Sequence, residues 1–317
     1  MKVIRSIWPL TKDTFQRWLD DKVPRLGAAL SYYTVFSLAP VLILVIALAG
    51  LIFGRDAAQG KIVGELRGLV GNDGAAIIQS MILQASIKSG GVIATVVGVV
   101  TLLVGATGVV VELQDALNTI WKVAPKPGRG VMGMVRDRML SFGLILAFGF
   151  LSIVSLAMSA GLAALGGWFS HIVPGWVVLG YVVNYGISFA IITLMFATMY
   201  KLLPDVKIAW RDVWVGAAVT SVLFHIGKFL IGLYLGKATV ASGFGAAGSL
   251  AVILVWVYYT SQIVLLGAEF TRVYADMFGS HVRPSDNAVS VAEGPAPHAA
   301  PEQSASSRPL PTASPSR

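Results

Sequence analysis

The chain of 317 residues contains no cysteine, and charged residues make up only 13% of it. Without cysteine, disulfides and thiolate metal sites are excluded. Soluble domains carry about 25% charged residues, and the mean hydropathy here is +0.75. This composition excludes most soluble enzymes and any mainly disordered protein. The charges present are mostly basic, 24 Lys and Arg against 16 Asp and Glu, as is typical of a membrane protein with basic cytoplasmic loops.

Six apolar stretches are each long enough to cross a membrane as a helix, which takes roughly 20 residues. Backbone groups cannot remain unpaired in lipid, so such stretches are expected to be helical. The sequence therefore predicts an all-α polytopic membrane protein whose six transmembrane helices form a domain of residues 27–275. The predicted spans are Gly27–Phe53, Val92–Val111, Leu140–Leu165, Trp176–Tyr200, Val213–Leu235 and Ser249–Tyr274.

The distribution of Lys and Arg around these stretches predicts the orientation. The N-terminal segment, the second and fourth loops and the C-terminal part together carry 18 of them, whereas the other loops carry 5. We therefore expect both termini to be cytoplasmic. This topology accounts for the basic charge, so no nucleic-acid partner is expected.

Three segments lie outside the predicted spans. Residues 1–26 are expected to form a helix that either lies on the inner leaflet or caps the bundle, because Leu10, Thr14, Trp18 and neighbouring apolar residues recur at helical spacing. Residues 55–90 are expected to form an extracytoplasmic helical hairpin that either covers a cavity or caps the bundle. Residues 276–317 are predicted to be a disordered cytoplasmic tail, because most of this segment is rich in Pro, Ala and Ser.

Polar side chains within apolar spans are costly in lipid and mark candidate functional positions. His225 lies near the middle of the fifth stretch, with Lys228 three residues later. They form either a buried cationic face for an anionic substrate, or a packing histidine beside a lysine that reaches the headgroups. Glu269 lies near the inner end of the sixth stretch, where a local ion pair with Arg272 is expected. Gln262 adds polarity one to two turns before it.

The first two stretches hold further candidates. Tyr32 and Tyr33 lie in a polar inner half, and Pro40 removes a helical hydrogen bond and predicts a hinge. Static bundles contain the same features, so a gated path and a rigid bundle both remain open. Three polar residues near the inner end of the second stretch either pair with loop arginines such as Arg136 and Arg138 or line a cytoplasmic mouth: Glu112, Asp115 and Asn118.

One motif imitates a nucleotide site. Gly243, Gly245 and Gly248 match the dinucleotide fingerprint GxGxxG, but that fingerprint requires a preceding strand within a soluble βαβ unit. Here the glycines are expected to allow a tight turn or a re-entrant entry into the sixth span. No catalytic residue, metal site or cofactor is predicted, because HExxH and GxSxG motifs are absent. The chain is expected not to be an enzyme.

Several motifs occur in a fixed order between residues 25 and 275. They are AALSYYTVFSLAP at Ala28–Pro40, ALNTIW at Ala116–Trp121, YKLLP at Tyr200–Pro204, and GAAG, WVYY and LGAE within Gly245–Glu269. Together they resemble the YihY/virulence factor BrkB family, although Phe244 stands where that family commonly has tyrosine. The resemblance implies a bacterial inner-membrane protein with six spans. Family members were long labelled ribonuclease BN, a label generally regarded as an error.

Transport of lipids or lipid precursors is a role suggested for the family. Our leading hypothesis is therefore transport or translocation of a lipid or another anionic envelope substrate. In this hypothesis Lys228 and His225 attract the anionic headgroup and Glu269 holds or gates the inner end. The alternative is a non-transporting membrane scaffold for envelope assembly, and a membrane enzyme is a third hypothesis. Expected partners are membrane lipids and envelope proteins, while the substrate and the oligomeric state remain open.

Overall fold

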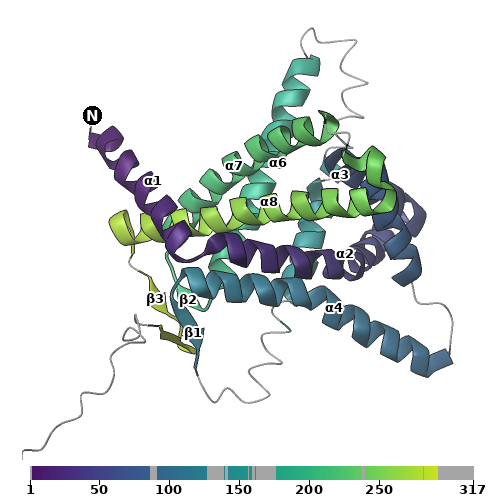
Figure 1. The fold of residues 1–317 in the computed structure, drawn as a ribbon, viewed down its shortest axis with the longest axis horizontal. Helices are drawn as coiled ribbons and strands as arrows, with labels where there is room; N and C mark the ends of the chain where they lie inside the picture. Colours follow the sequence, from purple (N-terminus) through teal and green to yellow (C-terminus); the bar gives the residue numbers. More distant parts are fainter. Residues whose placement is uncertain are drawn as a thin grey trace, which may run out of the picture.

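A computed structural model describes the chain over residues 2–85, 91–126, 139, 142–155, 157–158, 161, 176–237, 240–280 and 282–291. These residues are mostly helical (Figure 1), in agreement with the predicted all-α class. The helices are α1 (Lys2–Asp20), α2 (Val23–Phe53), α3 (Arg55–Ala85), α4 (Gly91–Ile120), α6 (Trp176–Leu202), α7 (Trp210–Lys237) and α8 (Val240–Phe278). The strands are β1 (Val123–Pro125), β2 (Val206–Lys207), β3 (Arg283–Pro284) and β4 (Ala288–Ser290).

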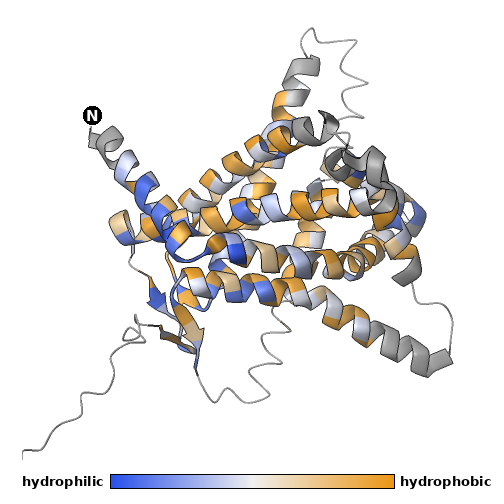
Figure 2. Ribbon diagram, in the orientation of Figure 1, coloured by the Kyte–Doolittle hydropathy of each residue, from blue (hydrophilic) through white to orange (hydrophobic). Residues whose placement is uncertain are grey.

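Five helices among the described residues are long and apolar enough to cross a membrane, and they lie within α2, α4, α6, α7 and α8. The remaining predicted span, at 140–165, contains an apolar helix over Phe142–Ser155, and most of the rest of that stretch lies outside the described residues. Large apolar side chains such as Phe36, Leu51 and Phe229 are exposed on the helices. Figure 2 shows hydrophobic residues along the long helices and hydrophilic residues on α1 and the strands. This distribution is typical of a bundle surrounded by lipid.

Helices α2 and α8 form the centre of the bundle. α2 packs against α4, α3 and α8, while α8 also contacts α7 and α1, and α6 packs on the outer side of α7. α1 and the strands lie at one end, which we call the α1 end (Figure 1). The other end, where α3 begins, is the α3 end, and the 31 residues of α2 separate the two by about 45 Å.

The N-terminal helix caps the bundle at the α1 end. Leu10 and Thr14 are buried, and α1 packs against α8. Trp8, Phe15 and Leu19 are exposed on the same helix. The helix expected over residues 1–26 ends at Asp20, and its packing on α8 agrees with the cap alternative, whereas contact of the exposed apolar side chains with the inner leaflet stays a prediction.

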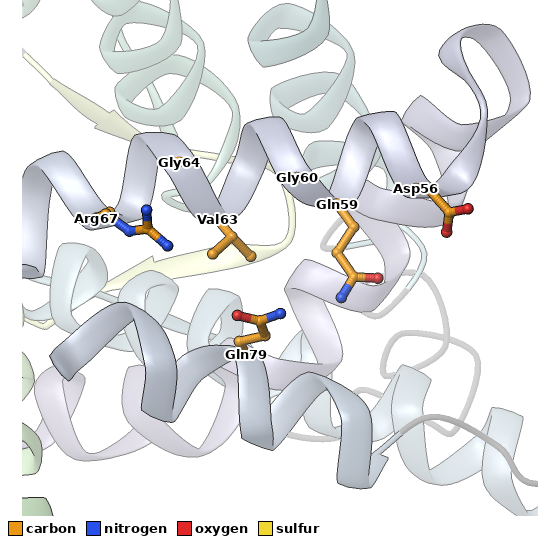
Figure 3. Close-up of a pocket in the computed structure, with 7 residues that line it drawn as sticks. All are labelled: Asp56, Gln59, Gly60, Val63, Gly64, Arg67 and Gln79. Atoms are coloured by element: carbon orange, nitrogen blue, oxygen red, sulfur yellow. The ribbon is translucent and has the colours of Figure 1, made fainter. Parts of the chain in front are cut away.

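The predicted hairpin at 55–90 differs from the structure at its turn. α3 is helical throughout, including Gly71–Gly74, where a turn was expected. Val63 in its first half and Gln79 in its second half nevertheless line one cavity (Figure 3). In a straight helix these two residues would lie about 24 Å apart. α3 therefore folds back on itself, so that its two halves face each other as expected.

The glycines of the GxGxxG motif do not form a turn. α8 is helical from Val240 onward, so Gly243, Gly245 and Gly248 all lie inside it. The expected break in the sixth span is therefore wrong. Within lipid a continuous helix keeps every backbone group hydrogen-bonded, and glycine is tolerated in such helices.

Helix α2 likewise continues through Pro40. The ring of this proline lies close to α4, because a Cβ atom at Gly105 would be 3.0 Å from the Pro40 Cγ atom. Pro40 is therefore a packing position between α2 and α4. A hinge at this position stays a prediction.

The C-terminal segment is ordered further than its composition predicted. α8 extends to Phe278, β3 pairs antiparallel with β2, and β4 pairs antiparallel with β1. The Lys207 ammonium donates to the Asp286 carboxylate at 2.6 Å and lowers the pKa of that carboxyl group. The prediction of disorder from residue 276 is thus wrong up to residue 291. The loops after α4 and α6 contain β1 and β2, and their backbone groups pair with β4 and β3. Residues 292–317 lie outside the described part.

Small residues allow α7 and α8 to approach each other closely. A Cβ atom at Gly267 would overlap the Thr220 hydroxyl oxygen and lie 2.6 Å from that of Tyr200. The fully buried Tyr200 hydroxyl donates to the carbonyl oxygen of Val264 at 2.7 Å and lies 3.1 Å from the Thr220 hydroxyl oxygen. At Gly216 an added Cβ atom would lie 2.7 Å from the Cβ atom of Thr271. Both contacts bring α7 against α8, and α6 joins them through Tyr200.

We expect Gly267→Ala to destabilise the bundle, because overpacking a close contact costs about 1–3 kcal/mol. The matched control is Gly186→Ala in α6, where an added Cβ atom would meet nothing within 4 Å. The unfolding temperature of each purified variant in detergent measures the effect. Equal unfolding temperatures for the two variants would show that the α7–α8 contact tolerates a methyl group.

Candidate functional site

Five charged side chains form an ionic cluster at the α1 end: Arg17, Asp21, Lys122, Arg272 and Asp276. Arg17 pairs with Asp276 at 2.8 Å. The Asp21 carboxylate, only 7% exposed, accepts from Lys122 and, at 3.4 Å, from Arg272. Arg272 also donates to the backbone carbonyl of Ile120. The cluster thus joins α1, the end of α4 and the last turns of α8.

Two helix ends place the cluster. α1 ends at Asp20 and α4 ends at Ile120. Two residues after each helix, Lys22 and Lys122 adopt left-handed backbone conformations, with φ of 53° and 52°. The N–H of Lys122 bonds to the carbonyl of Thr119 at 3.2 Å, as at a helix C-cap. A lysine or arginine there interacts favourably with the carbonyl end of the helix dipole. The chain turns between α1 and α2, and this turn places Asp21 beside Lys122.

Beside this cluster two polar side chains are enclosed within the bundle, and we call them the buried polar pair: Gln262 and Glu269 of α8. Glu269 is fully buried; its carboxylate accepts no hydrogen bond from a described donor group and lies within hydrogen-bonding reach of the Asp21 carboxylate. Both amide atoms of Gln262 are also buried without a hydrogen bond in the described structure. Gln262 contacts α2, since a Cβ atom at Gly27 would lie 3.1 Å from the Gln262 Cδ atom. Seven residues are about two helical turns, so the pair shares one side of α8.

Glu269 lies within the electrostatic reach of the ionic cluster. Its neighbours in charge are Asp21, Arg272 and Arg17. A buried polar group without a hydrogen bond costs about 1–3 kcal/mol, and more when it is charged. Such groups within membrane helices are generally functional. The indole N–H groups of Trp18 and Trp121 are also buried without an acceptor among the described residues.

The expected ion pair between Glu269 and Arg272 is not formed. Within the described chain, Arg272 pairs with Asp21 and with the Ile120 carbonyl. These acceptors lie at the ends of α1 and α4, where carbonyl groups and a carboxylate are available. The i+3 spacing alone therefore did not decide the partner of Arg272, and Glu269 lies beside the Asp21 carboxylate instead.

The predicted cationic face on α7 is not buried. Lys228 is exposed, as are Ile226, Phe229 and Leu230, so this side of α7 faces outward. His225 packs instead within an aromatic group of α6 and α7, and its Nδ1 atom lies 2.8 Å from the carbonyl oxygen of Ser221. The interpretation of Lys228 as part of a buried site is wrong, because its side of α7 packs against no other described helix.

Tyr32 and Tyr33 also lie on the outer surface. Their exposed fractions are 58% and 45%, and Tyr32 packs on Tyr33 and Phe36 of its own helix. The side of α2 that faces the bundle carries Ser31 and Ser37 instead. Ser37 faces α4, since a Cβ atom at Gly108 would lie 3.4 Å from its hydroxyl oxygen, whereas Ser31 bonds to the carbonyl of Gly27, the α2 position that faces Gln262 of α8.

The three polar residues at the end of α4 divide into different environments. Asn118 is buried, and its amide donates to the Asp205 carboxylate at 3.1 Å while its oxygen accepts from the Asp205 N–H at 2.8 Å. This pairing joins α4 to the turn after α6. Asp115 is exposed and Glu112 is partly exposed. The loop arginines expected to pair with them, at 136 and 138, lie outside the described residues.

The sequence pattern missed Asp21, Lys122, Arg17 and Asp276, which all lie near helix ends rather than within apolar stretches. A helix stop at residues 20–22 was the available signal for Asp21. In the described ranges no group of three or more His, Asp or Glu side chains is placed to hold a metal ion.

A model of the family described as Virulence factor BrkB matches residues 14–291, which include the ionic cluster and the buried polar pair. The chain belongs to this family. Among its relatives are UPF0761 membrane proteins of Verminephrobacter eiseniae, 27% identical over 88% of this chain and 65% of the relative, and of Ralstonia nicotianae, 28% identical over 82% and 57%. One from Pseudomonas aeruginosa is 32% identical over 80% and 59%. The chain thus spans about three-fifths of the length of these family members, and no solved structure matches it.

We expect Asp21→Asn to destabilise this family member, because it leaves Lys122 and the largely buried Arg272 without their carboxylate. Loss of one partner of a buried pair costs about 3–5 kcal/mol, and the partial exposure of Lys122 reduces this to about 2 kcal/mol. The matched control is Asp20→Asn, which changes the neighbouring exposed carboxylate. Unfolding temperatures in detergent measure both, and an equal loss would show that the cluster contributes no stability.

Proposed function

We propose that this membrane protein translocates a lipid or another anionic envelope substrate across the bacterial inner membrane, with both termini in the cytoplasm and without acting as an enzyme. The observation that carries the proposal is the buried polar pair, Gln262 and Glu269, between α8 and α2. Among the described residues, Gln262 has no hydrogen-bonding partner and Glu269 accepts from no donor but lies against the Asp21 carboxylate, although both lie inside an apolar bundle. A stable apolar scaffold gains nothing from these groups, whereas a polar path requires them.

The charges around Glu269 support a gating role. Arg17 and Arg272 lie at the α1 end of this path, where an anionic headgroup is attracted by guanidinium groups. An ionised Glu269 repels the same headgroup and competes with it for Arg272. Release of the substrate from the guanidinium groups is then favoured when Glu269 is ionised, and binding is favoured when it is neutral.

The path in this proposal runs between α2 and α8 rather than along α7. Lys228 is exposed on the outer side of α7, so it is not part of the path. Its long side chain extends to lipid headgroups, as lysines near the ends of membrane helices do. Substitution of Glu269, which is part of the path, is therefore expected to affect translocation, whereas substitution of Lys228 is not.

The test is translocation of fluorescent phosphatidylglycerol in proteoliposomes, followed by chemical quenching of the label in the outer leaflet. Wild-type protein is expected to accelerate translocation above protein-free vesicles. Glu269→Gln, which keeps the shape but removes the charge, is expected to slow it about tenfold or more, because the gating charge is lost. Lys228→Gln is the matched control and is expected to leave the rate within about twofold.

Two results would contradict the proposal. If Lys228→Gln stops translocation and Glu269→Gln does not, the substrate moves along the outer face of α7. If folded wild-type protein moves neither phosphatidylglycerol nor phosphatidylethanolamine, lipid translocation is excluded for the common headgroups.

The second candidate function is a membrane scaffold for envelope assembly. The α1 end favours it, because the ionic cluster and the strand pairs fasten α1, α4, the α6–α7 connection and α8 into one platform. A scaffold predicts that Glu269→Gln is harmless while disruption of this platform abolishes complex formation. Purification of each variant from membranes with its bound envelope proteins distinguishes the two functions.

A further inference from the structure

The α3 end carries a cavity of about 380 Å³ whose described lining residues all belong to α3 (Figure 3). Its volume falls within the range of about 300–1,000 Å³ usual for small-molecule sites. Gln59, Val63 and Arg67 come from the first half of the helix, and Gln79 comes from the second half and points toward them. The carboxylate of Asp56 lies at the edge. The fold-back of α3 thus creates a hollow with polar walls.

The polar side chains that line this cavity have no bonding partner within the described part of the chain. Within the described structure the side chains of Gln59, Arg67 and Gln79 make no hydrogen bond or ion pair. Gly60 and Gly64 leave the wall open, since an added Cβ atom at either would meet nothing within 4 Å. Arg67 and Gln79 are exposed, so the cavity is open to its surroundings, and Gln59 and Gln79 point toward each other across it (Figure 3).

The depth of the cavity relates it to the membrane surface. The apolar span of α2 ends at Leu51, and the first lining residue, Asp56, follows five residues later. The Asp56 edge of the cavity therefore lies near the end of this span, opposite the ionic cluster, whereas Ile78 beside Gln79 packs in one cluster with Leu42 and Ile46 of α2.

The three polar side chains define the chemistry of a ligand. A guanidinium group offers a planar set of donors that matches a phosphate, and carboxamides donate to and accept from hydroxyl groups. None of the described lining residues is aromatic, so they provide no stacking surface for a base or sugar ring. We infer that the α3 cavity binds the phosphate-bearing polyol of a headgroup, such as glycerol phosphate.

This inference deepens the proposed function by naming the headgroup chemistry, and in that respect rests on it. Binding is nevertheless measurable without translocation. The ligand is either part of a lipid or a free polyol phosphate, and both present the same group to Arg67.

The test uses full-length protein in phosphatidylcholine nanodiscs and two probes. The first is soluble sn-glycerol 3-phosphate, measured by isothermal titration calorimetry. The second is a photo-crosslinkable phosphatidylglycerol included in the nanodisc at a low fraction, with the labelled residues identified by mass spectrometry. Calorimetric binding assigns a free polyol phosphate, whereas crosslinking at α3 without calorimetric binding assigns a lipid headgroup.

Three variants test whether the probes bind in the α3 cavity. Arg67→Gln removes the charge, and Gly64→Leu fills the cavity at a position where added atoms meet open space. Each is expected to weaken calorimetric binding or crosslinking about tenfold or more. Lys61→Gln is the matched control, because Lys61 is an exposed cation of the same helix that does not line the cavity. It is expected to change either readout by less than about twofold.

Absence of binding to both probes would overturn the inference, and so would an equal loss in Lys61→Gln, which would indicate general attraction to a basic surface. The unfolding temperature of each variant identifies any loss of fold, and Arg67→Gln is then the deciding variant. Binding at α3 in a protein that fails to translocate lipid would retain this inference and reject the proposed transport. Translocation without binding at α3 would reject this inference and retain the proposed transport.

Discussion

The close contact of α8 with its neighbours is the constraint on which the rest of the structure depends. Gly27 on α2 and Gly267 on α8 allow side chains of the facing helix to lie directly on the backbone. Helices in lipid gain little from the hydrophobic effect on association, so close packing of this kind holds them together. It also encloses the buried polar pair, because Gln262 fits against α2 where α2 has no side chain. The packing and the candidate site therefore share the same residues.

The two ends of the bundle have different characters. At the α1 end, carboxylates, guanidinium groups and short strand pairs join segments that lie more than a hundred residues apart, as Lys122 and Asp21 do. At the α3 end the polar side chains of Arg67, Gln59 and Gln79 face a cavity and make no hydrogen bond or ion pair within the described part of the chain. The charged groups of the α1 end are thus paired with one another, whereas the polar groups that line the α3 cavity are not.

Residue patterns predicted the membrane class, the positions of the five spans found among the described residues, and two of the enclosed residues. Glu269 and Gln262 were identifiable because polar side chains in apolar stretches are rare and costly. The same rule also selected Lys228 and Tyr32, which the structure places on the outer surface. Polarity within a span indicates a candidate but does not say whether it faces lipid or the bundle, since that depends on how the helix is rotated against its neighbours. The residues of the ionic cluster near helix ends, such as Asp21, gave no comparable signal.

The sequence by itself determined the helices, because unpaired backbone groups are excluded from lipid and long apolar stretches therefore have one stable local structure. It also determined the family, through motifs that do not depend on any contact. Only the tertiary structure decided that Arg272 pairs with Asp21 rather than Glu269, that β3 and β4 order the segment after α8, and that α3 folds back around a cavity. These three features depend on contacts between groups that are distant in the chain, or on a choice between partners of similar strength. The packing of the helices decides which of these groups lie close enough to interact.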